Sequence, residues 1–132
     1  MLKKWSIAFL GVVITAAYAF AGDFPVVGAT YQIDRARFNN QKIAICATEK
    51  AMAKYMEAHW AGDKATMRKM LYKIETMDDV DRMKKECGCT LISSFSQAKI
   101  VKKGVEAHQA KFFAFPFEPM WGFYLYFGGK VK

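Results

Sequence analysis

The sequence predicts an α+β domain in which an N-terminal helical hairpin and a short third helix pack on a small antiparallel sheet. Apolar side chains in residues 42–87 recur every three or four positions, as they do in amphipathic helices. Residues 90–127 are instead rich in strand formers and are interrupted by serine, glycine and proline. Helices followed by a run of strands are typical of the α+β class. A curled, SH3-like barrel with the helices outside is the alternative.

The first 21 residues have the pattern of a secretory signal peptide. Lys3 and Lys4 form a basic start, residues 5–21 carry no charge, and Ala19–Ala21 has the small-residue spacing of a cleavage site. The alternative is a retained membrane anchor, for which 17 uncharged residues are at the short end. The sequence therefore predicts a periplasmic or secreted protein.

Residues 22–41 lack clear periodicity, so we expect an extended N-terminal arm with a short strand at Thr30–Ile33. Residues 42–132 then form a single domain, because no internal repeat and no long linker divides them.

Three helices are expected in the first half of this domain. The first is capped by Asn39 or Asn40 and ends at Gly62, with Cys46 in its early turns. Asp63 then caps the second helix at once, which predicts a tight hairpin. The apolar stripe of the second helix consists of Met67, Met70, Leu71 and Ile74.

The third helix is expected to start at Asp78 or Asp79 and to stop at Gly88. Strands are predicted at Thr90–Phe95, Ala98–Lys102, Val105–Phe115 and Met120–Phe127.

An aromatic-rich stretch, residues 112–127, dominates the C-terminal half. Nine of its sixteen residues are Phe, Tyr or Trp, and each such side chain buries roughly 150–250 Å². Three short helices cannot easily cover that area, so we expect part of the stretch to dock a partner protein or a second copy of the chain. In the last strand, the alternation of side chains directs Tyr124 and Tyr126 toward water. The predicted partner-binding residues are Phe113, Phe115, Phe117, Trp121, Tyr124 and Tyr126.

The second helix also has a basic side, and the formal net charge of +8 falls to +6 without Lys3 and Lys4. Such a charge favours anionic partners, either an acidic protein or an anionic membrane surface. The alternative is a solvated face that keeps the protein soluble. Nucleic acid is not expected, because the positive charges are dispersed and no binding motif is present. The predicted anionic-surface residues are Lys64, Arg68, Lys69 and Lys73.

Three cysteines in an exported chain predict a disulfide. Cys87 and Cys89 are too close in sequence to bridge easily, so Cys46 is expected to pair with one of them. The bond would tie the first helix to the end of the third and leave one thiol. Cys87 and Cys89 could alternatively bind a soft ion such as Cu(I). The seven methionines of residues 22–132 mostly fit helical stripes that fill a core, so no metal site and no cofactor is predicted.

No motif in the sequence indicates catalysis. The chain lacks a GxSxG elbow, a CxxC redox pair, the CxxCH haem signature and a glycine-rich phosphate loop. The sequence therefore predicts a non-catalytic binding or accessory subunit of the bacterial cell envelope. The alternatives are a copper carrier that uses Cys87 and Cys89, and a small secreted enzyme or toxin.

Overall fold

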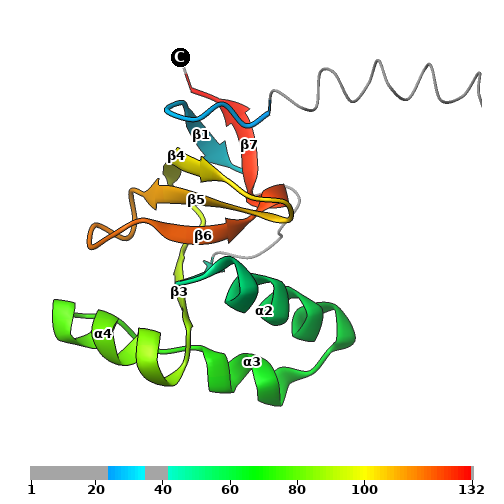
Figure 1. Cartoon of the computed structure of the whole chain (residues 1–132), viewed down its shortest axis with the longest axis vertical. Helices are drawn as coiled ribbons and strands as arrows, with labels where there is room; N and C mark the ends of the chain where they lie inside the picture. Colours follow the sequence, from blue (N-terminus) through cyan, green and yellow to red (C-terminus); the bar gives the residue numbers. More distant parts are fainter. Residues whose placement is uncertain (1–23, 35–41, 132) are drawn as a thin grey trace, which may run out of the picture.

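The computed structural model describes residues 24–34 and 42–131. The predicted signal peptide lies outside these ranges. Within them, three helices pack on a seven-stranded antiparallel sheet, which confirms the α+β class (Figure 1). The sheet is open, so the barrel alternative is wrong. Among the described residues, no helix has the length and apolar character needed to cross a membrane.

The seven strands are arranged in the order β3-β2-β6-β5-β4-β1-β7, and each neighbouring pair is antiparallel. β1 lies between β4 and β7, so residues from the expected N-terminal arm form an interior strand. The strands are β1 (Thr30–Ile33), β2 (Lys42–Cys46), β3 (Cys89–Ser93), β4 (Gln97–Lys103), β5 (Ala107–Phe112), β6 (Met120–Phe123) and β7 (Phe127–Lys130).

The first helix, α2 (Glu49–Ala61), starts later than the sequence predicts. Its N-cap is Thr48, whose Oγ1 accepts a hydrogen bond from the Ala51 N–H at 3.0 Å; Asn39 and Asn40 lie outside the described residues. The residues before it form β2 because an apolar run can be buried on both faces of a strand as well as in a helix. Cys46 is therefore at the end of a strand, and its expected helical position is wrong.

The joint between α2 and α3 (Lys64–Met70) is as predicted. Gly62 ends α2 with a φ of 72°. This left-handed backbone conformation strongly favours glycine, so the helix ends at this residue. Asp63 caps α3, with Oδ1 accepting from the Thr66 N–H at 3.1 Å. However, α3 ends four residues before Ile74, because the chain turns to run beside β3, where the Tyr72 N–H donates to the Cys89 carbonyl at 2.9 Å.

The third helix, α4 (Met77–Glu86), begins with a capping box rather than at the predicted aspartates. Thr76 is the N-cap, and its N–H donates to Asp79 Oδ2 at 3.0 Å. The backbone hydrogen bonds from Glu75 and Thr76 lower the pKa of Asp79. The helix buries Val80 and Met83 completely, so its cap positions two core side chains.

Replacing the capping hydroxyl is expected to weaken α4. Thr76→Ala should lower the free energy of unfolding by about 1 kcal/mol, the usual loss for an N-cap. Thr76→Ser is the matched control, because it retains the hydroxyl and should stay close to the original stability. Urea unfolding followed by circular dichroism measures both, and equal losses in the two variants would contradict the capping role.

The C-terminal aromatic segment is not one strand. β6 ends at Phe123, a 3₁₀ turn η1 (Tyr124–Tyr126) follows, and β7 starts at Phe127. The turn breaks the two-residue alternation on which the expected faces depended. Tyr126 consequently points inward and is only 2% exposed, so its expected contact with water is wrong.

His108 is a buried titratable group on β5, 6% exposed. Its Nδ1 accepts a hydrogen bond from the Gly104 N–H at 3.1 Å, so this nitrogen carries no proton. Burial lowers the pKa of His108, nearby Lys103 lowers it further, and Glu49 partly opposes both. Protonation is therefore less favourable in the folded than in the unfolded chain.

This difference predicts a loss of stability in acid. The contribution of His108 is fully present above its unfolded pKa of 6.5 and disappears as the pH falls through the lower folded value. His108→Asn should therefore lose less stability between about pH 7.5 and about pH 5, since asparagine offers an acceptor to the Gly104 N–H but does not titrate. Urea midpoints at both pH values test this. An unchanged pH dependence in the variant would exclude His108 as the source.

Candidate functional site

The predicted partner-binding residues do not form a single surface. Phe115 and Tyr126 are 4% and 2% exposed, so they belong to the core and cannot contact a partner in this structure. Phe117 and Trp121 are half-buried. Phe113 and Tyr124 are exposed, but they lie at opposite ends of the β5–β6 hairpin, because Ala110 pairs with Met120 and Ala107 with Phe123.

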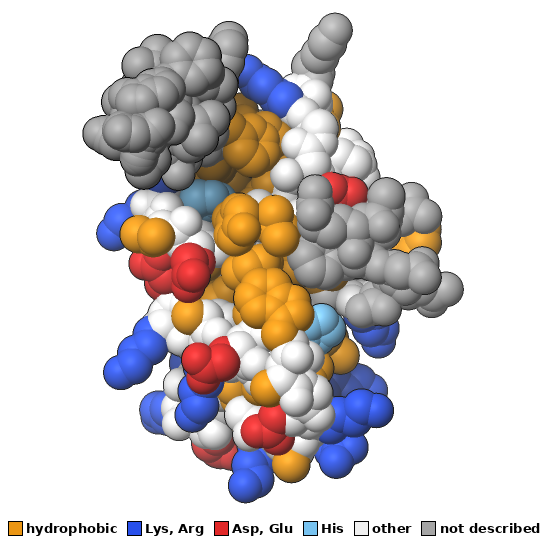
Figure 2. Space-filling view, turned by 90° about the vertical axis from the view of Figure 1, so that its right-hand side faces the viewer, with side chains coloured by type: hydrophobic (Ala, Val, Ile, Leu, Met, Phe, Trp, Pro, Cys, Tyr) orange, Lys and Arg blue, Asp and Glu red, His pale blue; other side chains and the backbone are white. Residues whose placement is uncertain are grey.

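At one end of this hairpin, an aromatic patch consists of the exposed rings of Trp60 and Tyr124 and the buried ring of Phe123, which contacts both. Trp60 is 64% exposed, and its ring lies edge-on to Phe123 with 5.1 Å between centroids. Phe123 in turn contacts Tyr124 at 4.7 Å. Figure 2 shows hydrophobic side chains gathered in a column along one face. Trp60 is not among the predicted partner-binding residues; its place two residues before the helix-ending Gly62 is the sequence signal that could have indicated its exposure.

The four predicted anionic-surface residues are exposed, but they do not all lie on the same element. Lys64, Arg68 and Lys69 lie on α3, whereas Lys73 lies after the end of the helix. Lys73 is 3.6 Å from Glu75, and an ion pair this exposed contributes little stability. Lys64 and Arg68 differ from the other two cations because they line a groove.

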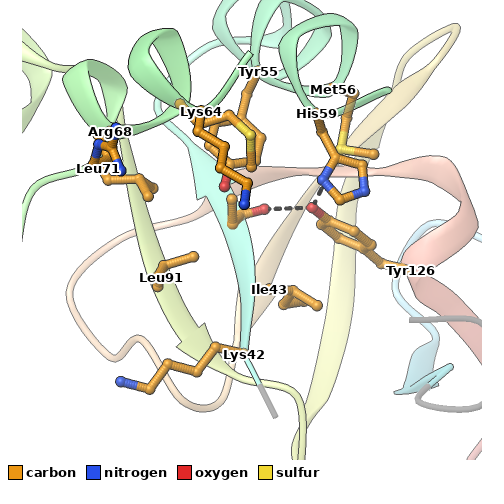
Figure 3. Close-up of a pocket in the computed structure, with 12 residues that line it drawn as sticks. Lys42, Ile43, Tyr55, Met56, His59, Lys64, Arg68, Leu71, Leu91 and Tyr126 are labelled. Atoms are coloured by element: carbon orange, nitrogen blue, oxygen red, sulfur yellow. Dashed lines mark hydrogen bonds between the residues drawn. The ribbon is translucent and has the colours of Figure 1, made fainter. Parts of the chain in front are cut away.

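This groove has a volume of about 700 Å³ and lies between the α2–α3 hairpin and strands β2 and β3 (Figure 3). It contains no acidic side chain among its twelve described lining residues. Cationic side chains come from both sides, with Lys64 and Arg68 on α3 and Lys42 on β2. The remaining lining residues are Ile43, Ala44, Tyr55, Met56, His59, Met67, Leu71, Leu91 and Tyr126.

The two phenols of the groove are neutral. The Tyr126 O–H donates to the Ala44 carbonyl at 2.8 Å and lies 3.8 Å from Met56 Sδ. Burial raises the pKa of Tyr126 and of Tyr55 above the ordinary value of 10.0. These two phenols therefore add no charge to the groove, whereas Lys42, Lys64 and Arg68 in the same lining are cationic.

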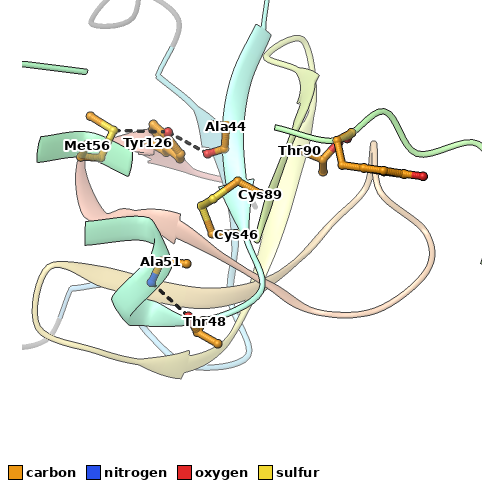
Figure 4. Close-up of a disulfide and its surroundings, with 9 residues drawn as sticks. Ala44, Cys46, Thr48, Ala51, Met56, Cys89, Thr90 and Tyr126 are labelled. Atoms are coloured by element: carbon orange, nitrogen blue, oxygen red, sulfur yellow. Dashed lines mark hydrogen bonds between the residues drawn. A yellow bond between two sulfur atoms is a disulfide. The ribbon is translucent and has the colours of Figure 1, made fainter. Parts of the chain in front are cut away.

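The disulfide joins Cys46 and Cys89 (Figure 4), which confirms a bond from Cys46 to one of the two later cysteines. The two residues are directly paired across β2 and β3, with their Cα atoms 4.0 Å apart. The bond thus links adjacent strands, and the expected link between two helices is wrong. Both residues are 0% exposed, and they are the last residue of β2 and the first residue of β3, the two strands that line the groove.

Cys87 is the free cysteine of the described residues, at the C-cap of α4 and partly buried. While the disulfide is intact, Cys89 cannot supply a thiolate, so Cys87 and Cys89 cannot act together as a soft-metal pair. Across residues 24–34 and 42–131, His, Cys, Asp and Glu do not cluster in threes that could hold a metal ion. The chain matches no known protein-family model, no curated protein and no solved structure.

Proposed function

We propose that this chain is an exported, non-catalytic binding protein, an accessory subunit of the bacterial cell envelope, that docks a protein partner through its aromatic patch. The observation that supports this proposal is the exposure of Trp60, 64%, and of Tyr124, 42%, on either side of the buried ring of Phe123. Trp and Tyr are enriched at the centres of protein interfaces, where they contribute much of the binding energy. Covering Trp60 and Tyr124 with a partner would remove exposed aromatic area from water.

Export is supported by two independent features. The N-terminal 21 residues have a signal-peptide pattern, and disulfides form and persist in oxidising compartments, consistent with the Cys46–Cys89 bond. The surface charge is suited to an acidic partner, because the exposed residues of α3 include three cations.

Site-specific photocrosslinking in the producing cell tests the docking proposal. A photoreactive phenylalanine at position 60 or 124 should give one discrete crosslinked product, either with an envelope protein or with a second copy of the chain. Position 95 is the matched control, since Phe95 is 55% exposed but lies outside the patch. No product at 60 and 124, or the same product at 95, would overturn the proposal.

Once the partner is identified, Trp60→Ala should weaken its binding by at least tenfold, as expected for a central interface residue. The variant should keep its thermal stability within a few degrees, because most of the Trp60 side chain is already in water. Phe95→Ala should leave the affinity unchanged. Loss of binding that accompanies unfolding would indicate a structural effect instead.

A further inference from the structure

We infer that the groove between the α2–α3 hairpin and strands β2 and β3 binds a single-chain anionic amphiphile, a long-chain fatty acid, with its alkyl chain inside and its carboxylate at the basic rim. The basic rim is defined as Lys42, Lys64 and Arg68. This site is separate from the aromatic patch and does not depend on the docking proposal.

The interior favours an apolar chain. The groove is lined by apolar side chains from α2, from α3 and the residue after it, and from β2 and β3: Ile43, Ala44, Met56, Met67, Leu71 and Leu91. Two of them are methionines, whose flexible side chains adapt to irregular apolar ligands. The volume, about 700 Å³, lies within the range of small-molecule sites, which are largely apolar with a few oriented polar groups.

Few polar groups line the interior of the groove. The Ala44 carbonyl already accepts the Tyr126 hydroxyl, and apart from the cations the other polar side chains of the lining are Tyr55 and His59. A ligand with polar groups along its length would therefore lose more hydrogen bonds to water than these two side chains can replace. An alkyl chain has no such groups to lose.

The basic rim selects the sign of the head group. Within the described ranges, no ion pair is formed by Lys42, Lys64 or Arg68, and the lining contains no carboxylate that could repel an anion. Figure 3 shows Lys64 and Arg68 on the helix side and Lys42 on the strand side, with Ile43 and Leu91 between them. An arginine can hold a carboxylate through two parallel hydrogen bonds, which suits Arg68 to the head group.

Palmitate binding to the chain with its Cys46–Cys89 disulfide intact tests the inference. Titration calorimetry below the critical micelle concentration should give saturable 1:1 binding. Hexadecanol probes the same chain without charge and should bind at least tenfold more weakly, while acetate should not bind measurably. Failure of palmitate to saturate at 1:1, or equal affinity for hexadecanol, would overturn the assignment.

Two pairs of variants with the same change in charge locate the head group. Lys64→Gln with Arg68→Gln should weaken palmitate binding at least tenfold, because both side chains line the groove. Lys69→Gln with Lys73→Gln removes the same charge from nearby positions in the chain that do not line the groove, and the dissociation constant of this variant should stay within twofold. Equal losses in the two pairs would show general electrostatic attraction and contradict a specific site.

A carboxylate placed in the groove provides the third arm. Leu91→Glu changes a lining side chain that is 42% exposed on an edge strand, so the variant should fold and should lose palmitate binding. Met77→Glu is the control, since Met77 is 53% exposed and does not line the groove. Binding retained by Leu91→Glu would overturn the inference. Binding of an acidic peptide at the basic rim, with no binding of palmitate, would also overturn the inference.

Discussion

Removing the Cys46–Cys89 disulfide is expected to lower the free energy of unfolding by about 4 kcal/mol. The two cysteines are 43 residues apart in sequence, and closing a loop of this length restricts the unfolded chain by about that amount in the chain-entropy estimate. A domain of this size has a total stability of about 5–15 kcal/mol, so this one bond contributes a large share.

The measurement is guanidinium unfolding of the original chain and of a variant carrying Cys46→Ala and Cys89→Ala. Cys87→Ala is the matched control, because it removes the remaining cysteine without opening the loop, and it should change the stability by less than about 1 kcal/mol. Reduction of the original chain should reproduce the loss seen in the double variant. A double variant as stable as the original would show that the bond does not limit the unfolded chain.

Phe112→Ala is expected to cost about 3–5 kcal/mol, the usual range for removing a large buried aromatic side chain. Phe112 is 1% exposed at the end of β5, and its ring lies 6.0 Å from that of Phe127 on β7. Its ring also fills the space above Gly122 on β6, where an added Cβ would come within 2.6 Å of Phe112 Cζ. Removing the ring therefore leaves a cavity that three strands share.

The neighbouring residue gives an unusually close control. Phe113 has the same side chain one position later but is 57% exposed, so Phe113→Ala should change the stability by no more than about 0.5 kcal/mol. Urea unfolding of the two variants makes the comparison. Similar losses of stability in the two variants would mean that burial does not determine how much Phe112 stabilises the fold.

The class of fold could be predicted because its signals are local. Gly62 and Asp63 mark a helix end and a helix start through backbone preferences that depend on few neighbours, and the structure has both. The start of α2 could not be placed, since residues 43–47 are apolar and a short apolar run fits either a strand or a helix. The inward turn of Tyr126 was equally hidden, because a 3₁₀ turn within an aromatic run has no sequence signature.

The groove was beyond sequence reasoning for a different reason. Lys64 and Arg68 were predicted as a basic surface, but Lys42, Leu91 and Tyr126 reach the same cavity from distant parts of the chain. Their proximity follows from the pairing of β2 with β3 and from the turn after β6. No local sequence pattern predicts either of these two contacts, because each joins residues that are far apart in the chain. The exposure of Lys64 and Arg68 could be predicted, because it follows from a local helical pattern.

The position of β1 sets the order in which the protein can be completed. Among the described strands, β7 hydrogen-bonds only to β1, which is the earliest of them in the chain. β7 can therefore join the sheet only after β1 has paired with β4. One edge of β1 therefore stays unpaired until β7 has been synthesised, so this side of the sheet is completed only when both strands are available.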